Sequence, residues 1–123
     1  FRFGLQFAGV AADFVAVDVN DHANATYAHN FGDTPLRKDI RHVTKAWVDK
    51  QCFTIWTMSP PCQPHTRQGH QQDTKDPRSA GFLHVLTLLR TVVTPPRYLL
   101  LENVRNFEAS ESCAQLLDAL RSR

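Results

Sequence analysis

The stretch at residues 53–69 reads FTIWTMSPPCQPHTRQG, and it joins an apolar strand to a stiff loop that carries a cysteine. Its first residues are bulky and β-branched, which is typical of a buried strand. Pro60 and Pro61 then end the strand and restrict the backbone immediately before Cys62. In an open α/β sheet the chemistry lies at the carboxyl ends of the strands. Cys62 is therefore either a nucleophile or a small buried residue in a turn, because free cysteines usually serve only packing.

A second apolar run, RYLLL at residues 97–101, ends in Glu102. Its composition also predicts a buried strand, and one predicted helix separates the two runs. Parallel strands joined by a helix end at the same edge of a sheet, so we expect Cys62 and Glu102 to be delivered to one site. Glu102 has a simpler interpretation as a strand-end acid that caps the following helix.

Helical and strand patterns alternate along the whole chain. Apolar spacing and breakers predict helices at residues 1–9, 22–31, 43–51 and 76–93, and a final helix near Arg123. Short strands or extended pieces are expected at residues 14–17, 36–40, 53–56 and 97–101. Four strand–helix alternations with short connections predict an α/β fold with an open, mainly parallel sheet of Rossmann-like type.

Polar residues at the helix starts are candidate N-caps. We expect Asp21 and Thr44 to cap the second and third helices, and Ser110 or Ser112 to cap the last one. The last helix has leucines at helical spacing, which are expected to face inward: Leu116, Leu117 and Leu120.

Asp18 closes the strand expected at residues 14–17 and precedes the helix at residues 22–31. The order helix, strand ending in an acid, helix is typical of the middle of a nucleotide-binding α/β unit. In such a unit the acid commonly binds ribose hydroxyls. Asp18 is therefore a candidate for binding a nucleoside-containing cofactor.

Composition bounds the class of protein. A length of 123 residues allows one domain with a real core, and 42% hydrophobic residues are ordinary for a globular chain. A net charge of +2 is compatible with nucleic acid without arguing for it, because dedicated binders cluster their basic residues. Three cysteines do not form a disulfide framework, and no apolar run approaches the ~18 residues of a membrane span. We therefore expect an intracellular protein.

Two motifs carry a resemblance to a known family. The stretch SPPCQP at residues 59–64 with the following Thr66-Arg67, and LENV at residues 101–104, resemble the paired motifs of the cytosine carbon-5 methyltransferases. They are most similar to the branch that modifies the anticodon loop of tRNA-Asp, and the resemblance covers nearly the whole chain. It implies a Rossmann-like S-adenosylmethionine-dependent methyltransferase fold, with S-adenosyl-L-methionine as cofactor and tRNA as partner. DNA is the alternative partner, because a sister branch performs the same chemistry on DNA.

The resemblance also assigns roles to residues. It implies that Cys62 is the catalytic nucleophile and that Glu102 is the catalytic acid. The cofactor-binding residues it implies are Asp18, Val19, Asp39, Ile40 and Pro61. The substrate-binding residues it implies are Gln63, Thr66, Arg67, Asn103 and Val104. Two of these have structural alternatives: Asp39 as a solvated loop acid, and Asn103 as a residue that holds the loop.

Carbon-5 methylation explains why these residue types are needed. Carbon-5 of cytosine is a poor nucleophile, so a thiolate must first bond to the neighbouring carbon-6. This attack builds negative charge at nitrogen-3, which a carboxyl group sharing a proton with that nitrogen would relieve. The base must also be flipped out or lie in an unpaired loop. Cys62 and His65 have no second paired ligand motif, so we expect no metal site.

Parts of the family's pattern are missing. The family's Gly-rich turn lies immediately before the stretch that Phe1 to Gly9 resembles, and its arginine motif, target-recognition region and last cofactor-facing strands lie beyond Arg123. His65 also replaces a usual phenylalanine. We therefore expect residues 1–123 to be an incomplete N-terminal portion of a single catalytic domain, inactive or nearly so alone, in the cytoplasm or nucleus. The alternative is a truncated, non-catalytic relative that binds nucleic acid or a partner.

Overall fold

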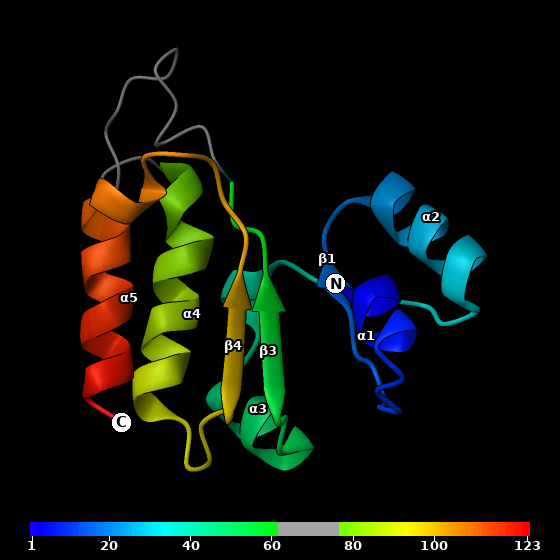
Figure 1. Cartoon of the computed structure of the whole chain (residues 1–123), viewed down its shortest axis with the longest axis horizontal. Coiled ribbons are helices and arrows are strands. Elements are labelled where there is room, and N and C mark those ends of the chain that lie inside the picture. The colour runs from blue at the N-terminus through cyan, green and yellow to red at the C-terminus, as the bar shows by residue number, and fades with distance from the viewer. Residues whose placement is uncertain (62–76) are drawn as a thin grey trace. The chain divides into compact units, whose positions relative to one another are not determined.

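The computed structural model describes residues 1–61 and 77–123, and it contains the α/β arrangement that the sequence predicts (Figure 1). The chain forms two compact units, Phe1–Ile40 and Arg41–Arg123. Each unit has one pair of hydrogen-bonded strands, and both pairs are parallel. The predicted parallel pairing of the strands is therefore confirmed.

The first unit has a short strand pair and two helices. Its elements are α1 (Arg2–Phe7), β1 (Val17–Asp18), α2 (Asp21–Phe31) and β2 (Leu36–Arg37). The strand expected at residues 14–17 is wrong in extent, because only Val17 and Asp18 pair in register with β2, while the Ala16 carbonyl accepts one further bond from the Leu36 N–H. The length of a paired strand depends on its partner in the folded structure, and β2 is only two residues long.

A cation surrounded by aromatic rings organises the first unit. The Arg2 guanidinium donates to the Tyr27 hydroxyl over 2.9 Å and forms an ion pair with Asp33. It also lies 4.7 Å from the ring centroid of Phe14 and 4.5 Å from that of Phe31. Such cation–π contacts tie α1, α2 and the segment before β1 together.

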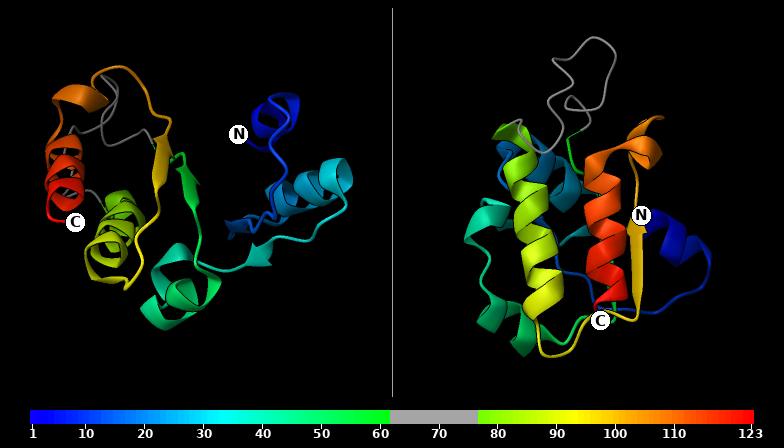
Figure 2. Two further views of the ribbon diagram at one scale, coloured as in Figure 1. Left: turned by 60° about the horizontal axis from the view of Figure 1, so that its bottom comes forward. Right: turned by 90° about the vertical axis from the view of Figure 1, so that its left-hand side faces the viewer.

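The second unit is a parallel strand pair with two helices on one face. Its elements are η1 (Ile40–His42, at the junction of the units), α3 (Lys45–Gln51), β3 (Ile55–Met58), η4 (Pro77–Ser79), α4 (Ala80–Thr91), β4 (Tyr98–Leu101), η5 (Phe107–Ala109) and α5 (Glu111–Arg121). In both views of Figure 2, α4 and α5 lie beside each other. They run opposite to the strands (Figure 1), as expected when a helix connects two parallel strands.

The core of the second unit lies between these helices and the sheet. Buried residues from α4, η5 and α5 form it: Phe82, Leu86, Leu89, Phe107, Leu116 and Ala119. The side chains of Trp56, Met58, Leu99 and Leu101 pack against it from β3 and β4. Alternation along β4 leaves Tyr98 and Leu100 about half exposed on the other face.

Two of the predicted caps are confirmed and one is wrong. The Thr44 hydroxyl accepts from the Trp47 N–H, and the Ser110 hydroxyl accepts from the Cys113 N–H. Asn20, rather than Asp21, caps α2, because its Oδ1 accepts from two backbone N–H groups of the first turn. Asp21 instead becomes the first helical residue.

The inward face of α5 also differs from the prediction. Leu116 is buried, as expected, but Leu117 and Leu120 are exposed. The small residues Ser112 and Ala119 are fully buried in their place. The buried residues Ser112, Leu116 and Ala119 are spaced i, i+4, i+7 and form one face of the helix, so the inward face is turned away from Leu117 and Leu120.

Candidate active site

The ends of β3 and β4 meet at the edge where the sequence predicts a site. Met58 lies opposite Leu101, and the Glu102 N–H donates to the Met58 carbonyl over 3.0 Å. The segments that follow the two strands therefore leave the sheet side by side. One consists of Ser59, Pro60 and Pro61, and the other begins with Glu102 and Asn103. Residues 62–76 lie outside the described residues. Four predicted site residues fall among them: Cys62, Gln63, Thr66 and Arg67.

Glu102 is the first residue beyond β4, and its side chain is exposed. Its backbone is held by the bond to Met58, whereas its carboxylate has no hydrogen-bond partner among the described residues. The alternative role as a helix cap is not what the contacts show, because Ser110 caps the following α-helix. The strand therefore places the exposed Glu102 side chain at this edge of the sheet.

Asn103 connects the two strand ends. Its Nδ2 donates to the Pro60 carbonyl over 3.3 Å, and its Oδ1 accepts from the Val104 N–H over 2.8 Å. These bonds agree with the alternative in which Asn103 holds the loop. Val104 is half-buried beside it.

The predicted cofactor residues of the first unit share another strand edge. Asp18 ends β1, and Val19 follows it. The Lys38 N–H donates to the Asp18 carbonyl over 3.2 Å, which brings the segment after β2, containing Asp39 and Ile40, to the same edge. Pro61, the fifth residue of this set, belongs to the second unit and is exposed.

The Asp18 carboxylate suits a hydroxyl-bearing ligand. One oxygen, Oδ1, accepts from the Asn20 N–H over 2.8 Å, which fixes the side-chain direction. The second oxygen has no partner among the described residues, and the side chain is exposed. A carboxylate held on one side and free on the other can accept hydrogen bonds from ribose hydroxyls.

Two asparagines that sequence reasoning missed support Asp18. Asn20 supplies the N–H that orients the carboxylate, and Nδ2 of the buried Asn24 donates to the Asp18 carbonyl over 3.0 Å. The pattern Asp18-Val19-Asn20 is typical of an Asx turn, in which a carboxylate accepts from the N–H two residues on. That local signal could have identified Asn20, whereas the contact of Asn24 needs the three-dimensional structure.

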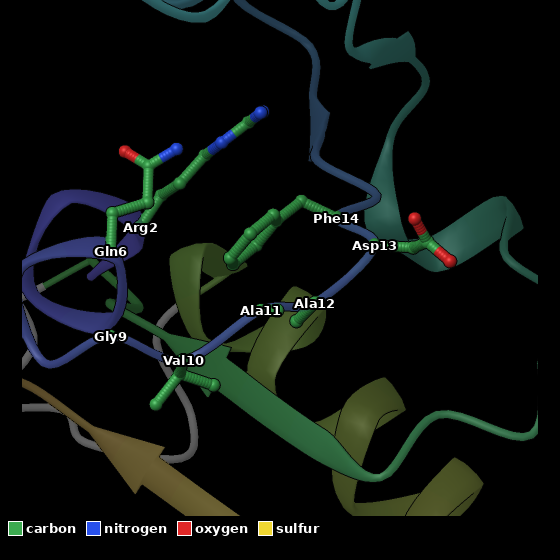
Figure 3. A pocket seen from close by; sticks show the side chains of 8 residues that line it. All are labelled: Arg2, Gln6, Gly9, Val10, Ala11, Ala12, Asp13 and Phe14. Carbon is green, nitrogen blue, oxygen red and sulfur yellow. The ribbon is translucent and has the colours of Figure 1, made fainter.

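A separate hollow of about 720 Å³ lies in the first unit (Figure 3). It is lined by Arg2, Gln6 and residues 9–14, and none of the predicted cofactor residues line it. Figure 3 shows Arg2 and Gln6 projecting from α1, across from Phe14. We therefore place the candidate cofactor residues at the strand edge rather than in this hollow.

Metal and membrane features are absent from the described part of the chain. No group of three His, Cys, Asp or Glu side chains within residues 1–61 and 77–123 could hold a metal ion. Among the same residues, no helix combines the length and apolar character needed to cross a membrane.

Comparison with known proteins identifies the family. A model of the C-5 cytosine-specific DNA methylase family matches residues 1–122. A tRNA (cytosine(38)-C(5))-methyltransferase of Schizosaccharomyces pombe is 40% identical over 98% of this chain and 37% of its own length. A DNA (cytosine-5)-methyltransferase of Dictyostelium discoideum is 38% identical over 97% of this chain and 32% of its own length. The crystal structure of the S. pombe Dnmt2 methyltransferase has a TM-score of 0.83 and 37% identity, covering 98% of this chain and 36% of that one.

The chain therefore belongs to the C-5 cytosine-specific DNA methylase family. It is related to tRNA cytosine-38 methyltransferases and spans about a third of the length of these relatives. The resemblance expected from the motifs SPPCQP and LENV is thus confirmed, together with the α/β fold class. Members of this family use S-adenosyl-L-methionine.

Proposed function

We propose that this chain supplies the nucleophile and the acid of an S-adenosylmethionine-dependent cytosine-5 methyltransferase that acts on tRNA. The observation that carries the proposal is the register of β3 and β4. It brings the Pro60-Pro61 segment, which leads directly to Cys62, beside Glu102 at one sheet edge. Membership of the family supports the same chemistry.

Cys62 and Glu102 have complementary roles in this proposal. The Cys62 thiolate adds its electron pair to carbon-6 of cytosine, and the displaced π electrons move toward nitrogen-3. Glu102 shares its proton with nitrogen-3 and limits the charge that builds there. After methyl transfer to carbon-5, a base removes the carbon-5 proton, and the electrons of that bond expel the Cys62 thiolate and restore the ring.

S-adenosyl-L-methionine supplies the methyl group as an electrophilic sulfonium substituent. Asp18 would bind its ribose hydroxyls through the free carboxylate oxygen, with Val19 alongside. Asp39 and Ile40 would contact the adenine, one by hydrogen bonding and the other by packing. Pro61, in the segment before the nucleophile, is the remaining residue that the family resemblance implies for cofactor binding.

The substrate would be an unpaired cytosine. A base in a tRNA loop is already unstacked, so it costs less to bring to Cys62 than a base in a duplex. The residues proposed to bind the substrate are Gln63, Thr66, Arg67 and Val104. Asn103 completes the predicted set, and its described contacts support a positioning role at this site. A tRNA substrate also agrees with an intracellular location in the cytoplasm or nucleus.

We further propose that the two compact units belong to one catalytic domain, of which residues 1–123 form an N-terminal portion. The relatives' length supports this, because the chain covers 37% of the S. pombe methyltransferase. Residues 1–123 alone are then expected to transfer no measurable methyl group, since parts of both pockets would come from other segments.

The test is a methyl-transfer assay on a chimera in which residues 1–122 replace the matching third of the S. pombe methyltransferase. Labelled S-adenosyl-L-methionine is offered with tRNA and, in parallel, with duplex DNA. We expect label in tRNA, no label with Cys62→Ala, and a loss of about 10²–10⁴-fold in kcat with Glu102→Gln. Circular dichroism of each variant checks that it is folded.

The assay also decides between the alternatives. Label in DNA rather than tRNA would favour the second candidate, a DNA cytosine-5 methyltransferase, which the D. discoideum relative supports. A folded chimera that labels neither nucleic acid would contradict the proposed activity. It would favour a non-catalytic relative instead.

A further inference from the structure

The backbone hydrogen bonds between β3 and β4 follow a regular pattern that is interrupted at Pro60. The Tyr98 N–H donates to the Thr54 carbonyl, and the Glu102 N–H donates to the Met58 carbonyl. In a parallel pair these bonds recur every second residue on each strand. Continuing the step would pair the Val104 N–H with the Pro60 carbonyl. Pro60 cannot return a bond to Glu102, however, because proline has no N–H.

The side chain of Asn103 occupies this next position of the ladder. The Val104 N–H donates to Asn103 Oδ1 over 2.8 Å instead of reaching Pro60. Asn103 Nδ2 then donates to the Pro60 carbonyl over 3.3 Å. One carboxamide thus lies between the two backbone groups that would otherwise bond directly, and it satisfies both.

Only an amide of this length can do this without rearrangement. The Val104 N–H can only donate, so the atom facing it must be the acceptor Oδ1, and the opposite atom must be Nδ2. A carboxylate offers two acceptors and would face the Pro60 carbonyl with a second oxygen. Alanine would leave both backbone groups without this partner. Glutamine would add a methylene and change the separation.

We infer that Asn103 is a positioning residue for the methyl-transfer site: its carboxamide replaces one backbone bond and sets the separation between the Pro60-Pro61 segment and Glu102. The catalytic consequence rests on the proposed function, because Pro61 directly precedes Cys62 in the sequence. The Asn103 carboxamide keeps the segments after β3 and β4 connected one residue pair beyond the regular sheet. It also holds them farther apart than a direct backbone hydrogen bond would. Such positioning affects the rate steeply, since reacting groups must be held close to their productive geometry.

The first test measures kcat and KM across pH for the S. pombe chimera carrying Asn103→Asp or Asn103→Ala. At neutral pH, Asn103→Asp is expected to lower kcat by roughly 10²-fold with little change in KM for tRNA. As the pH falls and the new carboxyl group gains a proton, it regains a donor toward Pro60. The kcat of Asn103→Asp relative to the unsubstituted chimera should therefore rise, whereas the ratio for Asn103→Ala should stay flat.

Asn20→Asp is the matched control for folding. Asn20 also accepts through Oδ1, from the His22 and Ala23 N–H groups, but its amide donors make no bond among the described residues. The same chemical change there should leave amide exchange within α2 nearly unchanged, because Asn and Asp are comparable N-caps.

The second test does not depend on activity. Amide hydrogen exchange of the Val104 N–H is measured in residues 1–123 for the unsubstituted chain and for the variants Asn103→Asp and Asn103→Ala. We expect protection to persist in the aspartate variant and to fall at least about tenfold in the alanine variant.

The two tests separate the possible failures. An inactive chimera with Val104 behaving as expected would count against the proposed function alone. An active chimera in which Asn103→Asp keeps its full kcat at every pH would overturn the positioning role. If the Val104 N–H exchanged at the same rate in the Asn103→Ala variant as in the unsubstituted chain, the hydrogen bonding assigned to Asn103 would be contradicted.

Discussion

The two units of the chain are each stabilised by different interactions. Every buried hydrophobic side chain among the described residues lies in the second unit, from Val43 to Ala119. In the first unit the buried residues are Asn24 and Pro35, and Phe3 and Phe7 are exposed. The first unit depends on one cation, Arg2, surrounded by aromatic rings and paired with an acid.

This difference shows that secondary structure alone does not make the units equal in stability. Burial of apolar surface is the main favourable term in folding, and the second unit has an α4–α5 core that provides it. Polar and cation–π contacts contribute less and are weakened by water. We therefore expect the first unit to open locally while the second remains folded.

Amide hydrogen exchange should show the largest contrast. Amides in the middle of α4, near Leu86 and Leu89, should exchange only through opening of the second unit. Amides of α2 should exchange at least about 10²-fold faster, because local opening of the first unit exposes them. Equal protection in α2 and α4 would break the comparison and indicate one cooperative unit.

Truncating the core should have the next largest effect. Leu89 is 1% exposed, so Leu89→Ala is expected to reduce the free energy of unfolding by about 2–5 kcal/mol. Leu117→Ala is the control, because Leu117 is 44% exposed and its loss should cost less than about 0.5 kcal/mol. Urea denaturation followed by circular dichroism measures both. A similar cost for the two variants would contradict the assigned core.

Removing a helix cap in each unit should sharpen the contrast. Ser110→Ala removes the acceptor of the Cys113 N–H, and Asn20→Ala removes the acceptor for α2. Each should cost about 1 kcal/mol of helix stability. Ser110→Ala should lower the unfolding midpoint of the second unit, whereas Asn20→Ala should only speed exchange within α2. A midpoint shift of equal size from Asn20→Ala would show that the units unfold together.

The smallest expected effect is the dependence of stability on pH through Asp49. The Lys45 ammonium, aided by the Val93 N–H, lowers the pKa of the Asp49 carboxyl below its ordinary value of 3.8. A lowered folded-state pKa adds stability that is fully present above the unfolded value and is lost as the pH falls through the folded one.

The difference in melting temperature between the unsubstituted chain and the Asp49→Asn variant should therefore be constant near neutral pH. It should shrink as the pH falls below about 4. Asp118→Asn is the control, because the Asp118 carboxylate pairs with Arg90 but is 76% exposed and should contribute little. A difference that does not change between pH 7 and 2 would contradict the assigned ion pair.

Much of the fold could be predicted from local patterns. The apolar run before Pro60 and the run before Glu102 predict two strands, and their parallel pairing follows from the helix between them. Thr44 and Ser110 were predictable caps because their hydroxyl groups precede helical patterns directly. The strand edge that holds Glu102 follows from the same reasoning.

The rest depends on contacts that no local pattern contains. The extent of β1 is limited by the length of β2, and the exposure of Leu117 and Leu120 depends on which face of α5 meets the core. The bond from Asn103 to Pro60 joins residues 43 positions apart, so no local pattern predicts it. The roles of Cys62 and its neighbours stay predictions, since they lie outside the described residues.

The long separation between β3 and β4 has a consequence for synthesis. Asn103 and Pro60, at the ends of the two strands, are 43 residues apart. A ribosome adds about 5–20 residues per second, so β3 is made roughly 2–9 s before its partner exists. During that time α4 is made, but Trp56 and Met58 still lack β4 and the part of the core that η5 and α5 supply, and unpaired apolar strands tend to aggregate. The nascent chain is therefore most in need of a chaperone between the synthesis of Met58 and that of α5.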